Sequence, residues 1–174
     1  MRRPLAAAGS VVFFALAPGV VAGAIPYWLT GWRPGLPLRS WLPARIAGFL
    51  LLTAGAVVLV HAFIRFVAQG RGTPAPVVPT EELVVTGVYR YVRNPMYLAV
   101  LAVIVGQALV LWQGVLLTYA AVVCASFVVF VKAYEEPTLA RQFGEQYAAY
   151  RRAVPGWWPR RRPWAGSGEP FQAD

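Results

Sequence analysis

Long apolar stretches alternate with short polar segments along the whole chain. A bilayer core about 30 Å thick requires about 20 mostly apolar residues per transmembrane helix. Stretches that approach or exceed this length run over residues 8–29, 46–66, 96–112 and 115–134. The pattern predicts an all-α, polytopic membrane protein with four transmembrane helices in a single domain covering residues 1–174.

The first apolar stretch has a second interpretation. Arg2 and Arg3 precede it, and Ala22-Gly23-Ala24 near its end resembles the small-residue cleavage site of a secretory leader. The stretch is long for a leader and further apolar stretches follow, which favours a retained helix.

Only Gln113 and Gly114 lie between the third apolar stretch, 96–112, and the fourth, 115–134. So short a connection predicts an antiparallel helical hairpin. Residues just before position 96 and just after position 134 should therefore meet at one membrane surface.

Charge distribution predicts which surface this is. The chain is 58% hydrophobic and 13% charged, with a mean hydropathy of +0.53. Of its 16 basic residues, only Arg33, Arg39 and Arg45 fall on the side opposite the N-terminus, the 67–95 loop and the 135–174 tail. The positive-inside rule then places both termini in the cytoplasm. All 7 acidic residues share that side.

The net charge of +9 does not indicate a nucleic-acid partner. Basic residues that flank membrane spans set topology and attract anionic lipid headgroups, and no nucleic-acid module is recognisable. The single cysteine, Cys124, suits packing, so no metal site is expected. Abundant Arg, Ala, Gly and Pro suggest a GC-rich bacterial genome and hence an inner-membrane protein.

The segment "GVYRYVRNPMY", residues 87–97, leads into the third helix. Pro95 suits a first helical turn and Asn94 is a favoured N-cap residue. Unpaired N–H groups beside Arg93 would then face the cytoplasm and can hold a carboxylate or a phosphate. The alternative is an ordinary capped helix with arginines and tyrosines at the membrane interface.

Glu135 and Glu136 end the fourth apolar stretch, where the helix dipole and their mutual repulsion both disfavour them. Such a local conflict indicates function, although a solvated acidic pair is the alternative. After Pro137, apolar and aromatic residues recur at helical spacing, which predicts an amphipathic interfacial helix over 138–152.

These motifs resemble the isoprenylcysteine carboxyl methyltransferase family and the related phospholipid methyltransferases. The likeness rests on "GVYRYVRNPMY" followed, after one hairpin, by "EEPTLARQFGEQYAAYRRAVP", and it covers residues 65–159. The resemblance implies an integral membrane methyltransferase that binds S-adenosylmethionine at the cytoplasmic end of the last helices. A lipophilic small-molecule or lipid-linked substrate would enter from the bilayer.

The resemblance also carries over site residues. The cofactor-binding candidates are Gly87, Tyr89, Arg93, Asn94, Pro95, Tyr97, Glu135, Glu136 and Tyr147. Asn94 stands where the family usually has a histidine, which speaks against proton transfer at this position. Arg93 and Asn94 would hold the cofactor carboxylate, and the two glutamates its ammonium or ribose hydroxyls.

The catalytic candidates are Arg90, Glu136 and His61. Arg90 would hold an acidic group of the substrate, and the other two are the available proton acceptors. A prenylcysteine-like or isoprenoid carboxylate needs no base, whereas a phospholipid amine or a small thiol must lose a proton. The scarcity of bases favours an anionic acceptor. A membrane scaffold, a complex subunit and a small transporter are the alternatives outside enzymes.

Overall fold

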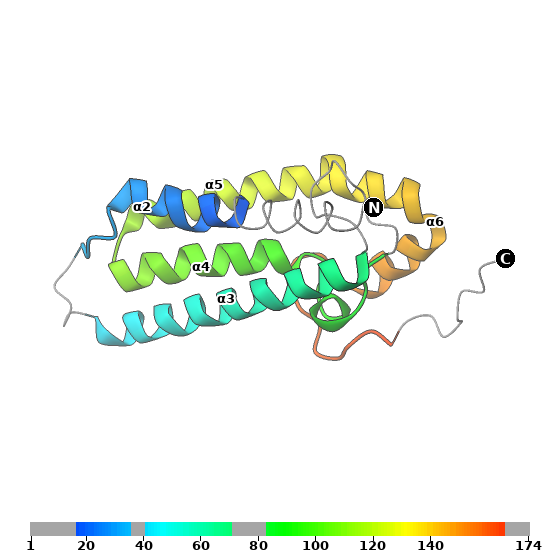
Figure 1. Ribbon diagram of the computed structural model, residues 1–174, viewed down its shortest axis with the longest axis horizontal. Coiled ribbons are helices and arrows are strands. Elements are labelled where there is room, and N and C mark those ends of the chain that lie inside the picture. Colours follow the sequence, from blue (N-terminus) through cyan, green and yellow to red (C-terminus); the bar gives the residue numbers. More distant parts are fainter. Residues whose placement is uncertain (1–16, 36–40, 71–82, 166–174) are drawn as a thin grey trace, which may run out of the picture.

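The computed structural model describes residues 17–35, 41–70 and 83–165, and all regular structure in these ranges is helical (Figure 1). The elements are η1 (Val20–Ala24), α2 (Ile25–Thr30), α3 (Leu42–Gly70), η2 (Gly87–Arg90), α4 (Pro95–Leu111), α5 (Gly114–Phe130), η3 (Val131–Glu135) and α6 (Glu136–Ala153). The all-α class is confirmed.

Two helices of the described residues are long and apolar enough to cross a membrane, namely Leu42–Arg65 and Gly114–Ala153. α4 is a shorter apolar helix of 17 residues. The first predicted span is helical from residue 17 to Thr30, and residues 8–16 lie outside the described ranges. Length and composition therefore support two spans, and the count of four stays a prediction.

Glycines allow α3 and α4 to run side by side in close contact (Figure 1). A Cβ atom added to Gly106 of α4 would lie 2.8 Å from the carbonyl oxygen of Gly48 in α3. One added to Gly55 would lie 2.9 Å from the carbonyl oxygen of Ala99 and 3.0 Å from the Cβ of Ala102. Small residues at such positions let two helix backbones approach closely. This contact fixes the end of α3 beside the start of α4.

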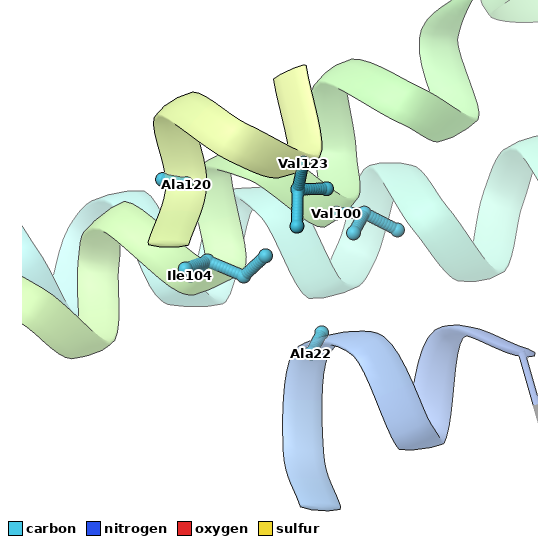
Figure 2. Packing of buried hydrophobic residues seen from close by; sticks show 5 residues of the cluster. All are labelled: Ala22, Val100, Ile104, Ala120 and Val123. Atoms are coloured by element: carbon cyan, nitrogen blue, oxygen red, sulfur yellow. The ribbon is translucent and has the colours of Figure 1, made fainter. Parts of the chain in front are cut away.

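The predicted hairpin is confirmed. α4 ends at Leu111, Trp112 adopts a left-handed conformation at φ 54°, and α5 begins at Gly114. Figure 2 shows how the hairpin packs against the first helical segment. Its buried cluster consists of Ala22, Val100, Ile104, Ala120 and Val123.

Polar side chains tie the hairpin to the same segment. The Gln107 side-chain amide donates to the carbonyl oxygen of Ala22 at 2.6 Å, and the Tyr119 hydroxyl donates to that of Val21 at 2.9 Å. Gln107 is buried, as expected for a polar group at membrane depth that faces the interior of a helix bundle.

Tryptophans gather where α2 ends and α3 begins. Trp28 is 82% exposed, and Trp41 stacks on Trp112 with ring centroids 5.1 Å apart. Exposed aromatic rings of this kind are typical of a membrane–water interface. The polar groups described next lie at the opposite end of the helices, where α4 starts and α6 turns (Figure 1).

One predicted boundary is wrong. The fourth apolar stretch was expected to end at residue 134 and a separate helix to cover 138–152. Instead the helix continues from α5 through the π-helical η3 into α6, with Pro137 in the first turn of α6. Pro137 lies inside this continuous helix, directly after the wider π-helical turn, and does not end it. The backbone leaves helical geometry only at Gly144, at φ 47° and ψ −124°.

Candidate functional site

The backbone before α4 places most of the predicted site residues. Gly87 opens η2 at φ 59°, a conformation that side chains with a Cβ rarely adopt. A Cβ there would also lie only 3.1 Å from Nε2 of His61 on α3. Both facts explain a glycine at this position. η2 can therefore lie directly against the end of α3.

A C-terminal segment, residues 154–165 and hereafter the tail segment, runs along residues 90–94. The N–H groups of Arg93 and Asn94 donate to the carbonyl oxygens of Pro155 and Gly156 at 3.0 and 3.3 Å. Further along, the N–H groups of Arg160 and Trp164 donate to the carbonyl oxygens of Tyr91 and Arg90, both at 3.0 Å. The tail segment thus forms part of the site.

Sequence reasoning missed the tail segment. The available signal was the cluster of tryptophans among arginines in "GWWPRRRPW", which indicates an interfacial segment but not its partner. Its main contacts to residues 90–94 are made by backbone groups. Backbone hydrogen bonds carry no residue-type signature, so the pattern of side chains could not reveal them.

Arg93 joins α4, α6 and the tail segment. Its Nη1 donates to Oε1 of Glu136 at 2.8 Å and to the hydroxyl of Tyr147 at 2.9 Å, while its Nε donates to the carbonyl oxygen of Val154 at 3.0 Å. The second carboxylate oxygen of Glu136 lies 3.2 Å from Nη2 of Arg151. The Arg93 and Glu136 side chains are only 13% and 14% exposed. This ion pair is therefore largely shielded from solvent.

The neighbouring carboxylate has a different partner from α4. The Tyr97 hydroxyl donates to Oε2 of Glu135 at 2.8 Å. The Tyr97 ring lies against Phe127 of α5, with centroids 4.7 Å apart, and faces Trp157 of the tail segment at 6.4 Å. The two adjacent glutamates thus accept hydrogen bonds from Arg93 and Tyr97, which lie at the start of α4. The predicted meeting of the two ends of the hairpin is present in the structure.

Tyr89 lies in a buried position beside this cluster. Only 7% of it is exposed, it packs with Ala62 of α3, and its carbonyl oxygen accepts a hydrogen bond of 2.7 Å from the Tyr150 hydroxyl. Burial raises the pKa of the Tyr89 phenol, and the nearby Tyr150 and Glu135 raise it further. The Tyr89 hydroxyl therefore stays protonated at physiological pH and acts as a neutral group.

Asn94 occupies the N-cap position of α4, but its side chain makes no capping hydrogen bond. The predicted capping role of this side chain is therefore wrong. Asn94 is 6% exposed, and its Nδ2 is buried without a hydrogen-bond partner. A buried donor of this kind is costly unless something accepts from it. An acceptor atom of a bound ligand would satisfy this donor.

Gly156 borders this donor. A Cβ on Gly156 would lie 3.4 Å from Nδ2 of Asn94 and 3.2 Å from Nη2 of Arg93. The absence of a side chain therefore lets the tail segment pack closely against two nitrogen donors. Nε and Nη1 of Arg93 donate hydrogen bonds within the protein. Nη2 of Arg93 and Nδ2 of Asn94 are therefore the donors that a ligand oxygen could accept from. Together with Glu135 they fit a ligand that carries a carboxylate and an ammonium group.

A cleft of about 750 Å³ lies on the other side of η2. Its lining residues are His61, Arg65, Val85, Thr86, Gly87, Val88, Arg90, Tyr91, Pro163, Trp164 and Ala165. The structure thus divides the predicted site residues, apart from Tyr89 and Pro95, into two groups. His61, Gly87 and Arg90 line the cleft, whereas Arg93, Asn94, Tyr97, Glu135, Glu136 and Tyr147 form what we call the arginine–carboxylate cluster.

The described residues form an apolar helical hairpin with a polar cluster at one end. A sequence model of the phospholipid methyltransferase family matches residues 43–146. This range runs from the start of α3 into α6 and covers more than half of the chain. The protein belongs to the phospholipid methyltransferase family, a family of methyltransferases, as the sequence motifs predicted. No curated protein and no solved structure matches the chain.

Proposed function

We propose that the protein transfers a methyl group from S-adenosylmethionine to a lipophilic acceptor at the cytoplasmic face of the membrane. The observation that carries this proposal is the arginine–carboxylate cluster. It brings Glu135 and Glu136 to the start of α4, beside the unpartnered Nδ2 of Asn94. The family match covers every member of this cluster except Tyr147.

Each member of the cluster has a role in cofactor binding. Asn94 Nδ2 and Arg93 Nη2 would donate to the carboxylate, while Glu135 and Glu136 would accept from the ammonium or the ribose hydroxyls. Tyr97 and Tyr147 orient the glutamate and arginine side chains. Gly87, Tyr89 and Pro95 shape the backbone around them. When bound, the cofactor supplies an electrophilic methyl group on a sulfonium.

The protein's own contribution is mainly positioning and exclusion of water. Both carboxylate oxygens of Glu136 lie against arginines, which favours an orienting role over proton transfer. His61 is then the available proton acceptor on the substrate side. Arg90, also in the cleft, would hold an acidic group of the acceptor.

Membrane topology in this proposal follows the basic residues. Four spans, with both termini in the cytoplasm of a bacterial cell, place the cluster and the cleft at the cytoplasmic surface. The exposed tryptophans at the opposite end of the helices, near the start of α3, support a second membrane–water interface there. Membrane lipids are then the direct surroundings of α3 and α5.

The acceptor we propose is a prenylcysteine-like or isoprenoid carboxylate, because an anion needs no base and the cleft is cationic. The family match favours a second candidate, a phospholipid amine. A small thiol is the third candidate for the methyl acceptor, because His61 alone could take up its one proton. Transfer of labelled methyl into lipid, small-molecule and protein fractions of native membranes separates these candidates.

Cofactor binding is the decisive test. Protein purified into nanodiscs should bind S-adenosylhomocysteine saturably, and Glu135→Ala or Arg93→Ala should abolish this binding. Glu145→Ala is the matched control, because Glu145 is an exposed carboxylate on the same helix. Asn94→Ala, which removes the unpartnered donor without breaking the ion pair, should also weaken binding. The proposal fails if folded wild-type protein shows no saturable binding.

A further inference from the structure

The tail segment has an outer face that differs from the face bound to residues 90–94. Trp158 is 80% exposed, and Arg161 and Arg162 are exposed as well. The sequence has no aspartate or glutamate between Glu145 and Glu169. The outer face therefore combines a large aromatic ring with positive charge.

The tail segment lies at the depth where the apolar span of α3 ends. This span runs from Leu42 to Arg65. Arg65 lines the same cleft as Pro163 and Trp164, and Figure 1 shows the tail segment, coloured orange to red, beside the end of α3. The end of an apolar span marks the headgroup region of the bilayer. With α3 in the membrane, the tail segment lies beside the lipid headgroups.

The residue types on the outer face fit an anionic bilayer surface. A tryptophan ring is favourable at headgroup level, and a guanidinium group can donate two parallel hydrogen bonds to one phosphate. Each arginine near an anionic membrane surface favours the contact by about fivefold, and salt screens this attraction. A soluble anion would use the arginines but leave the indole ring of Trp158 in water.

The conformation of the tail segment is restricted before any lipid contact. Prolines, which fix φ, recur at every fourth position, namely Pro155, Pro159 and Pro163. At one end of the segment Val154 is fully buried, and near the other end Trp164 packs on Tyr150 with ring centroids 5.4 Å apart. The stretch 158–162 is thus held from both sides, which lowers the entropy lost when it binds.

We propose that the outer face of the tail segment docks on the anionic lipids of the bilayer, and that this contact keeps the segment on residues 90–94. Trp158 enters the interface, and Arg161 and Arg162 bind lipid phosphates. The inner face transmits the effect, because the N–H groups of Arg93 and Asn94 donate to its carbonyl oxygens. An anionic membrane surface then orders the start of α4 and, with it, the arginine–carboxylate cluster.

Hydrogen–deuterium exchange followed by mass spectrometry measures this contact. Full-length protein is compared in nanodiscs of phosphatidylcholine and in nanodiscs of an equal mixture of phosphatidylcholine and phosphatidylglycerol. The reporters are peptides with the amides that join the two segments, those of Arg93, Asn94, Arg160 and Trp164. Their exchange should be at least about fivefold slower in the anionic nanodiscs, and added salt should reduce the difference. Amides inside α4 should exchange equally in both and control for the overall fold.

Variants assign the effect to the outer face. Arg161→Gln/Arg162→Gln should lose most of the difference between the two lipids, whereas Arg161→Lys/Arg162→Lys keeps the charge and should retain it. Trp158→Ala should reduce the difference without unfolding the protein, because this side chain is largely exposed. Arg33→Gln removes the charge of an exposed arginine at the opposite end of the helices and should exchange like the wild type.

Three results would overturn the inference. They are equal exchange of the wild-type protein in the two kinds of nanodisc, full protection in Arg161→Gln/Arg162→Gln, and equal protection by inorganic phosphate in neutral nanodiscs, which would indicate a soluble oxyanion instead. The measurements contain no cofactor, so their outcome is independent of the proposed function. A lipid effect on exchange in protein that does not bind S-adenosylhomocysteine would support the docking and contradict the methyltransferase proposal.

Discussion

Arg93 and Glu136 lie 43 positions apart in the chain and form an ion pair with 2.8 Å between Nη1 and Oε1. Arg93 immediately precedes the start of α4, and Glu136 is the first residue of α6. The hairpin of α4 and α5 must close for this pair to form. Arg93 also binds the carbonyl oxygen of Val154, so the same side chain fixes the start of the tail segment.

Glu136→Gln should destabilise the protein and weaken S-adenosylhomocysteine binding. The substitution keeps the shape but removes the charge that Arg93 and Arg151 both face. Hydrogen bonds to charged groups contribute roughly 1.5–3 kcal/mol, and the low exposure of the pair favours the upper part of this range. Thermal unfolding in detergent measures the loss of stability. Glu145→Gln, at an exposed carboxylate of α6, should unfold like the wild type.

Gly156→Ala should weaken cofactor binding. Its methyl group would occupy the space beside Asn94 Nδ2 and Arg93 Nη2, at 3.4 and 3.2 Å. Affinity for S-adenosylhomocysteine, measured by calorimetry in nanodiscs, should fall by about tenfold, as expected when one charge-assisted hydrogen bond is lost. Gly114→Ala is the control, because nothing lies within 4 Å of a Cβ there. Equal affinity of Gly156→Ala and wild type would argue against a ligand at this place.

The sequence predicted the hairpin and the meeting of its ends because both follow from local information. Apolar length fixed α4 and α5, and the two-residue connection fixed their antiparallel direction. Once the direction is known, Arg93 and Glu136 must approach each other. The motifs around Arg93 and Glu136 also predicted the family, and the family match confirms it.

Two features were not predictable from the pattern of side chains. The helix continues past Glu135 through a π-helical turn, and α6 leaves helical geometry at Gly144 before it ends at Ala153. The tail segment binds residues 90–94 chiefly through backbone groups, which are the same for every residue type. The cleft depends on the tail segment, since Trp164 forms part of its wall. The position of Arg65 in this cleft was therefore not predicted, and from the sequence Arg65 indicated only the membrane topology.

Tyr97→Phe should test whether the hydrogen bond to Glu135 matters beyond packing. The ring contact with Phe127 is kept, and only the donor to Oε2 of Glu135 is lost. We expect roughly 1–2 kcal/mol of lost stability. If Glu135 binds the cofactor, the looser carboxylate should also reduce affinity for S-adenosylhomocysteine by about tenfold. Phe127→Leu, which changes the packing and keeps the hydrogen bond, should affect stability more than affinity.

Gly106→Ala should force α3 and α4 apart and destabilise the protein. The added Cβ would lie 2.8 Å from the carbonyl oxygen of Gly48 and from the Cβ and N atoms of Leu52, and backbone atoms cannot move aside cheaply. Overpacking of this kind typically costs about 1–3 kcal/mol, which should lower the unfolding temperature in detergent. Gly23→Ala, where nothing lies within 4 Å, should unfold at the wild-type temperature. Unchanged stability in Gly106→Ala would contradict this close packing of α3 against α4.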